Sequence, residues 1–180
     1  MTHDTILRWE IGGIPFIFFT GAMLHFLYAW SGFWPPLVSL TAVNESMWEH
    51  FKLAFWTTVA YALIQYLRAG KLLVNFWPAK AAGLLVMPVI IAVLFYGYKA
   101  VLGRHSLLLD ALIFLVAVWA GQMLSYRILT APRAPDVVQT LGLAAFVILV
   151  TAFLTFSYIP PHHFLFQDPA TSQYGSPERH

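Results

Sequence analysis

The chain has 180 residues, of which 59% are hydrophobic and only 10% are charged, and its mean hydropathy is +0.70. This composition excludes a soluble globular domain and indicates an integral membrane protein. The net charge of +2 is too small to suggest nucleic-acid binding. Because cysteine is absent, disulfides, thiolate metal sites and cysteine nucleophiles are also excluded.

Apolar stretches of spanning length follow one another along the chain, separated by short polar segments. A helix needs roughly 20 residues to cross the hydrocarbon of a bilayer. The stretches are continuously apolar rather than alternating, which favours helices over a β-barrel. The predicted fold is all-α, an integral membrane bundle of five transmembrane helices over about residues 7–30, 44–68, 77–101, 105–129 and 136–158. We expect one transmembrane domain, 1–160, followed by a short extracytoplasmic tail, 161–180.

The first stretch does not resemble a cleaved signal peptide, because Asp4 and Glu10 lie near its start and Pro15 interrupts it.

The lysines and arginines of the short loops predict the orientation. With the N-terminus in the cytoplasm, six of them lie inside and three outside. We therefore expect a protein of the bacterial inner membrane, with its N-terminus in the cytoplasm and its C-terminus outside.

The second stretch opens on a polar cluster, Asn44-Glu45-Ser46-Met47-Trp48-Glu49-His50. Charged groups beside hydrocarbon are costly, so this cluster is the best functional lead in the sequence. On a helix, Glu45, Glu49 and Lys52 share one stripe, and Ser46 and His50 share the adjoining one. The alternative is that the cluster only starts a helix, since Asn44 suits an N-cap and Ser46 to Glu49 fits a capping box.

An odd number of helices brings several other polar residues to the same end of the bundle as this cluster. They are His25 in the first stretch, His105 and Asp110 at the start of the fourth, and His162, His163 and Asp168 after the fifth. Asp110 lies about two turns inside an apolar stretch, so it needs a partner such as Lys52 or a histidine. The pair His162-His163 is typical of a solvated turn after two prolines.

Imidazoles and carboxylates without thiols suit zinc or another divalent metal. The preferred metal ligands are His50, His25 and Asp110, with Glu49 or Glu45 as general base. Ser46 and His50, four residues apart, could instead form a nucleophile and base pair. These residues favour a metal-dependent hydrolase that acts on a lipid or another amphiphile.

Two other function classes stay open. One is a non-enzymatic accessory subunit that packs against a larger membrane complex, with the polar cluster as a structural network. The other is a small transporter or proton-coupled carrier, in which Glu45, Glu49, Lys52 and Asp110 titrate along a path. In each case the lipid bilayer is the expected surrounding, and other membrane subunits are possible partners only in the accessory case.

The run Asn44–Leu53, with His25-Phe26-Leu27-Tyr28 before it and Leu109-Asp110 after it, carries a family resemblance. It resembles an uncharacterised family of small bacterial polytopic membrane proteins with an Asn-Glu-Ser-x-Trp-Glu-His-x-Lys signature. That resemblance covers most of the chain and implies a fold but no reaction. A fainter similarity is to seven-helix membrane metallohydrolases of the ceramidase and progestin-receptor type, whose motif positions Ser46, His50 and Asp110 would match. His162-His163 lacks the His-x-x-x-His spacing of those enzymes, and the chain has two helices fewer.

Overall fold

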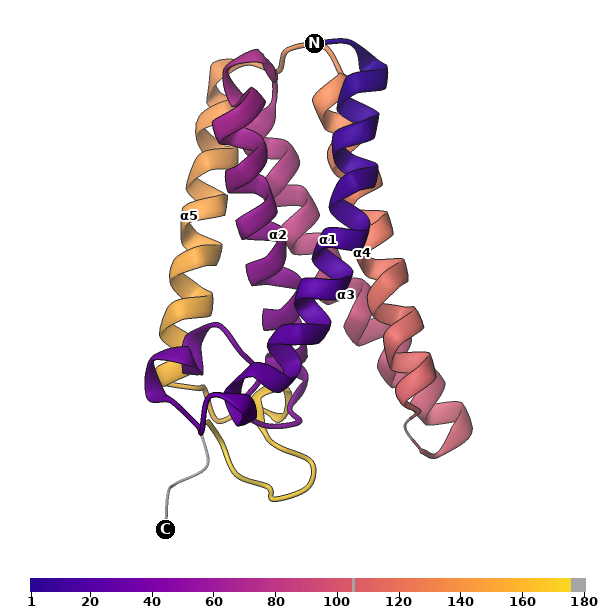
Figure 1. Ribbon diagram of the computed structural model, residues 1–180, viewed down its shortest axis with the longest axis vertical. Coiled ribbons are helices and arrows are strands. Elements are labelled where there is room, and N and C mark those ends of the chain that lie inside the picture. Colours follow the sequence, from indigo (N-terminus) through magenta and orange to yellow (C-terminus); the bar gives the residue numbers. More distant parts are fainter. Residues whose placement is uncertain (105, 176–180) are drawn as a thin grey trace.

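The computed structural model describes residues 1–104 and 106–175, apart from the side chain of residue 71. Its described part is all-helical and contains no β-strand. The long helices are α1 (His3–Trp30), α2 (Met47–Ala69), α3 (Phe76–Leu102), α4 (Leu107–Thr130) and α5 (Asp136–Tyr158). Short 3-10 helices are η1 (Pro35–Ser39), η2 (Gly70–Leu72) and η3 (Phe164–Phe166). The long helices run alternately in opposite directions, side by side (Figure 1).

Each long helix matches a predicted stretch, with ends that differ by about four residues at most. The start of α2 differs because the Asn44 side chain accepts the backbone N–H of Ser46 at 2.8 Å, which holds residues 44–46 outside the helix. At the end of α3, Gly103 adopts a left-handed conformation with φ +67°. Glycine adopts it without strain, so the chain can turn sharply toward α4.

Four of the five helices, α1, α3, α4 and α5, are long and apolar enough to cross a membrane. This confirms an integral membrane protein and the membrane-spanning character of those four predicted stretches. Helix α2 falls below this hydropathy level because it carries polar residues such as Glu49, Lys52 and Gln65, all of them buried. It runs between the same two ends of the bundle as its neighbours (Figure 1), and its crossing stays a prediction.

The buried position of α2 explains this composition. Fourteen of its 23 residues are buried, against three of 23 in α5. Helix α2 packs on α1 and α3, both of which also pack on α4, and α5 lies against α3. Close contact between α3 and α4 depends on two glycines, because a Cβ at Gly83 would lie 3.2 Å from the carbonyl oxygen of Gly121. Large apolar side chains such as Phe19, Val93 and Ile148 stay exposed on the other helices, where they suit lipid.

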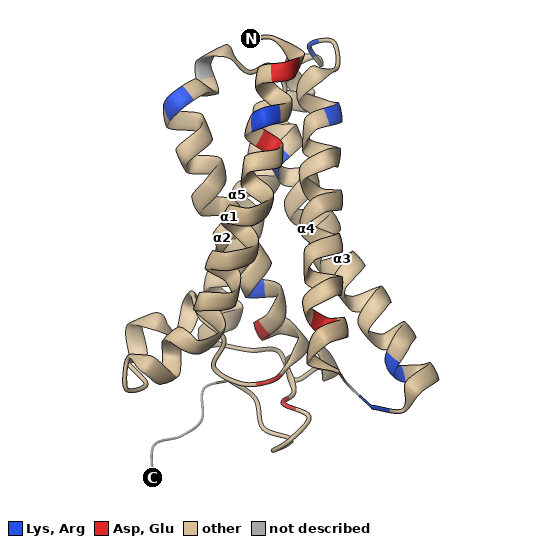
Figure 2. Cartoon of the chain, turned by 45° about the vertical axis from the view of Figure 1, so that its right-hand side comes forward, with Lys and Arg blue, Asp and Glu red and all other residues tan. Residues whose placement is uncertain are grey.

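The two ends of the bundle differ in what they hold. The ends of α1, α3 and α5 and the starts of α2 and α4 lie toward the same end of the molecule, which we call the site end, although the end of α3 and the start of α4 splay away from the others (Figure 1). The N-terminus lies at the opposite, N-terminal end (Figure 1). The arrangement agrees with the predicted gathering of polar residues at one end, although His105 lies outside the described residues. Charged residues occur toward both ends, and the middle of the bundle shows none (Figure 2). Which end faces the cytoplasm stays a prediction.

Candidate functional site

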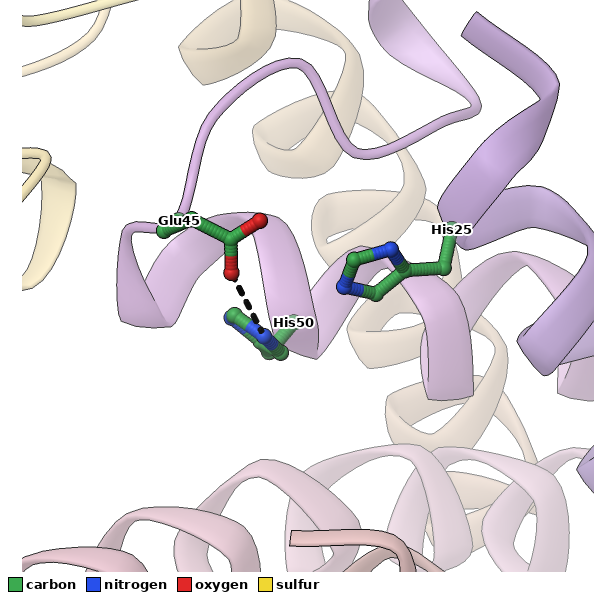
Figure 3. Close-up of side chains that lie close together, drawn as sticks. All are labelled: His25, Glu45 and His50. Carbon is green, nitrogen blue, oxygen red and sulfur yellow. Dashed lines mark ion pairs between the residues drawn. The ribbon is translucent and has the colours of Figure 1, made fainter. Parts of the chain in front are cut away.

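Three side chains from separate parts of the chain meet at the site end (Figure 3). His25 extends from α1, Glu45 from the loop before α2, and His50 from the first turns of α2. One nitrogen of each histidine and one oxygen of Glu45 lie within 4.8 Å of one another. The histidines are half-buried and Glu45 is exposed. This group, which we call the His-Glu group, is therefore both held by the bundle and accessible to solvent.

The ring of His50 is oriented by the backbone of its own helix. Its Nδ1 lies 2.9 Å from the carbonyl oxygen of Ser46. A carbonyl can only accept, so Nδ1 carries the hydrogen and donates it. In the neutral ring Nε2 is then an acceptor, and it lies 3.7 Å from Oε2 of Glu45, which is also an acceptor. This approach suits a bridging group that attracts both atoms: a metal ion between them, a proton on Nε2 or a water molecule.

His25 completes the group from the neighbouring helix. Its ring lies edge-on to that of His50, with the two ring centres 5.6 Å apart. In a tetrahedral zinc site with bonds of about 2.1 Å, ligand atoms lie roughly 3.4 Å from one another. The spacing between His50 and Glu45 is close to this value, and the exposed Glu45 side chain is free to adjust. The donor atoms and their spacing thus fit a small divalent cation.

A buried ion pair fixes the segment that carries Glu45. Glu49 Oε2 lies 2.6 Å from Lys52 Nζ, and their side chains are only 4% and 0% exposed. The Glu49 carboxylate also accepts the backbone N–H of Val43 at 2.9 Å, while Lys52 donates to the carbonyl oxygen of Val38 in η1 at 2.7 Å. These contacts tie the loop before α2 to the helix. Glu49, predicted as a general base, is held by structural partners here.

The chain after α5 folds back over the start of α2. Trp48 stacks on Phe153 of α5, with ring centres 4.3 Å apart, and contacts Phe166 of η3 at 4.6 Å. Asn44 donates from its side-chain amide to the carbonyl oxygen of Gly175 at 2.8 Å. Residues 161–175 of the predicted tail therefore support the loop that carries Glu45.

The structure places Asp110 apart from the His-Glu group. Asp110 lies half-buried in the first turn of α4 and accepts a hydrogen bond from the hydroxyl of Tyr98 in α3. The Tyr98 oxygen also accepts the backbone N–H of Ser106 at 3.2 Å, so these contacts link the end of α3 to the start of α4. The pairing of Asp110 with Lys52 or a histidine stays a prediction. His162, also predicted at this end, stacks on Tyr174 with ring centres 4.6 Å apart.

Ser46 is placed at the N-cap of α2, but its hydroxyl makes no capping hydrogen bond. The residue is 1% exposed, and its backbone N–H and carbonyl form the contacts described above. A side-chain N-cap is worth about 1 kcal/mol. We therefore expect Ser46→Ala to change the free energy of unfolding in detergent by less than about 1 kcal/mol and to leave metal binding unchanged. A larger loss would mean that the hydroxyl has a partner in the site.

Sequence reasoning missed a second polar cluster, at the N-terminal end. Glu10, Gln65, Lys80 and Ser125 come from four different helices and are each 1% exposed or less. In the sequence, Glu10 is evidence against a signal peptide and Lys80 is a marker of orientation. The available signal was that each lies inside an apolar stretch, three or four residues from its end.

Comparison with known proteins gives one family match. The model of the family of unknown function DUF6512 matches residues 1–176. No curated protein and no solved structure matches the chain. The expectation of an uncharacterised family is thus confirmed, whereas the proposed signature and the similarity to ceramidase-type enzymes stay predictions.

Proposed function

Since the chain belongs to the DUF6512 family of unknown function, membership brings no reaction with it, and we propose from the site alone that the protein binds a divalent metal ion through His25, Glu45 and His50. Zinc suits two imidazoles and a carboxylate best. Three protein ligands leave a fourth position open, as in catalytic rather than structural zinc sites. The proposed reaction class is metal-dependent hydrolysis.

The observation that carries the proposal is the position of His50. Its Nδ1 donates to a backbone carbonyl, and Nε2 points toward a carboxylate. A metal-bound histidine commonly donates its other ring N–H to a carbonyl or carboxylate in this way, which fixes the ring and its tautomer. A metal ion bound here would act as a Lewis acid toward a substrate and a water molecule.

The location of the group suggests an amphiphilic substrate. His25 lies five residues before the end of α1, or about 8 Å along the helix axis at 1.5 Å per residue. Beyond it, Phe26 and Trp30 stack on each other and are 51% and 67% exposed. Exposed aromatic residues near helix ends are typical of the membrane interface. A headgroup or a bond near the headgroup of a lipid lies at this depth.

Metal analysis of the purified protein tests the proposal. After dialysis against a trace of zinc, the wild type should retain about one equivalent of the metal. We expect His50→Ala and His25→Ala each to lose most of it, because two remaining ligands bind zinc much more weakly than three. His163→Ala is the matched control, since His163 is an exposed histidine at the same end of the bundle. Equal zinc in all four proteins, or none in the wild type, would contradict the proposal.

A proton on His50 is the other cation that fits the observed geometry. In that case the ring would be an imidazolium paired with Glu45, and zinc would not compete for Nε2. Nitrogen NMR of labelled histidine separates the two cases, because zinc shifts Nε2 of His50 while Nδ1 keeps its hydrogen. If zinc leaves the His50 resonances unchanged, the group is an ion pair and not a metal site.

A second candidate function is a proton-coupled carrier, and one observation favours it. Helix α2 contains one buried ion pair at the site end, Glu49 with Lys52. Through Gln65 it also contacts a second buried pair at the N-terminal end, Glu10 with Lys80. Carriers use such intramembrane charges as binding and relay sites. The test is a proteoliposome with a pH-sensitive dye inside, in which a carrier acidifies or alkalises the lumen when a substrate gradient is imposed.

The accessory-subunit prediction stays untested.

A further inference from the structure

The cluster at the N-terminal end is a hydrogen-bonded network between four helices. Lys80 Nζ donates to Glu10 Oε1 at 2.8 Å and to Ser125 Oγ at 2.9 Å. Gln65 Nε2 donates to the same Glu10 oxygen at 2.7 Å. Gln122 of α4 donates to the backbone carbonyl of Glu10 at 3.1 Å. Glu10 is thus the centre of the network, and one of its two carboxylate oxygens receives both side-chain donors.

Two oxygen atoms in this network lack a donor. Glu10 Oε2 and Gln65 Oε1 are both buried, and neither has a hydrogen-bond partner among the described residues. They belong to the two groups that the Gln65 to Glu10 hydrogen bond already joins. A buried acceptor without a donor costs free energy, and most such atoms in native proteins have a partner. Both atoms therefore point to a ligand that donates hydrogen bonds.

The charges around Glu10 decide what that ligand is. Among the described residues, Lys80 of α3 supplies one positive charge, Tyr61 of α2 is a titratable neighbour, and α4 contributes the neutral Ser125 and Gln122. Glu10 and Lys80 already neutralise each other. A metal cation, or a proton on Glu10, would leave a net positive charge in a buried place, and an anion would meet the carboxylate.

We propose that Glu10, Gln65 and Lys80 form a binding site for one water molecule, which donates to Glu10 Oε2 and Gln65 Oε1. Water is uncharged and has two hydrogens for two acceptors. Lys80 has three ammonium hydrogens, of which two bind Glu10 and Ser125, so the third is available for the water oxygen. Buried waters typically make about three hydrogen bonds, which this arrangement provides.

The site has a consequence for the membrane-embedded part of the protein. Glu10 lies seven residues after the start of α1, about 10 Å along the helix axis. A bound water there hydrates the Glu10–Lys80 pair inside the bundle. It provides a partner for proton exchange that none of the surrounding apolar side chains can offer.

An experimental structure at a resolution that resolves ordered water is the direct test, with Gln65→Met as the matched variant. In the wild type we expect a water peak within hydrogen-bond distance of both oxygens. In Gln65→Met, which keeps the side-chain length but removes the amide oxygen, the peak should weaken or disappear while Lys80 still contacts Glu10. The proposal is overturned by absence of the wild-type peak, by ion-like coordination from four or more oxygens, or by a direct hydrogen bond from a protonated Glu10 Oε2 to Gln65 Oε1.

A measurement that does not need Gln65→Met covers the case in which that variant does not fold. The proposal keeps Glu10 ionised, so infrared spectra at pH 7 should contain no protonated carboxyl band from Glu10. Labelling glutamate with carbon-13 identifies such a band by its shift. A shifted band at pH 7 would mean that a glutamate holds a proton. If Glu45→Gln, Glu49→Gln and Glu178→Gln all retain the band, the proton is on Glu10 and the water proposal fails.

Discussion

Lys52→Met should lower the free energy of unfolding in detergent by about 3–5 kcal/mol, the usual cost of leaving one member of a buried ion pair alone. The Lys52 side chain is fully buried, and its ammonium lies 2.6 Å from the Glu49 carboxylate. Without it, Glu49 keeps the backbone N–H of Val43 as its neutral partner but loses its counter-charge. Denaturant unfolding followed by tryptophan fluorescence measures the loss.

An exposed ion pair supplies the control for this experiment. Arg133 and Asp136 lie 2.9 Å apart, but their side chains are 66% and 87% exposed. Surface pairs contribute about 0–1 kcal/mol, so Arg133→Met should have little effect. Glu49→Gln together with Lys52→Met should be less harmful than Lys52→Met alone, because the double variant leaves no buried charge. Similar small losses in all variants would mean that Glu49 and Lys52 are solvated.

The same variant links the ion pair to the proposed metal site. Lys52 also holds Val38 of η1, and Glu49 holds Val43, two residues before Glu45. Loss of the pair should therefore loosen the loop and weaken zinc binding even though neither residue is a proposed ligand. If the Lys52→Met protein folds and binds zinc like the wild type, the ion pair does not support the metal site.

Hydropathy predicted the helices well because lipid constrains every residue of a spanning segment. The five stretches and their approximate ends follow from it, with Pro135 and Gly103 at helix boundaries. It could not show that α2 is the buried helix. Polar residues on a lipid-exposed helix indicate a functional site. On the buried helix α2, several of these residues, such as Lys52 and Gln65, instead have structural partners on neighbouring segments.

The candidate site was partly predictable for a topological reason. Alternating helices place His25, Glu45 and His50 at one end, and the sequence shows that much. Topology does not give lateral position, so it could not decide between Asp110 and Glu45 as the neighbour of the histidines. The structure places Glu45 in the group and Asp110 beside Tyr98 of α3. The Glu10 cluster was missed because its members are far apart in sequence and each alone has an ordinary explanation.

A double-mutant cycle on Glu10 and Lys80 should show strong coupling. Both side chains are essentially fully buried, 2.8 Å apart, and contributed by different helices. Glu10→Gln leaves the Lys80 ammonium without a counter-charge, and Lys80→Met leaves the Glu10 carboxylate in the same state. Each should lower the free energy of unfolding by about 3–5 kcal/mol.

The double variant, Glu10→Gln with Lys80→Met, tests whether charge is the cause. It removes both charges, while the amide that replaces the Glu10 carboxylate can still accept a hydrogen bond from Gln65. Its loss should therefore be smaller than the sum of the two single losses by about 2 kcal/mol or more. The free energies come from denaturant unfolding in one detergent, with helix content checked by circular dichroism. Additive losses would mean that Glu10 and Lys80 do not depend on each other, and the four-helix network would then be held by its neutral hydrogen bonds rather than by the ion pair.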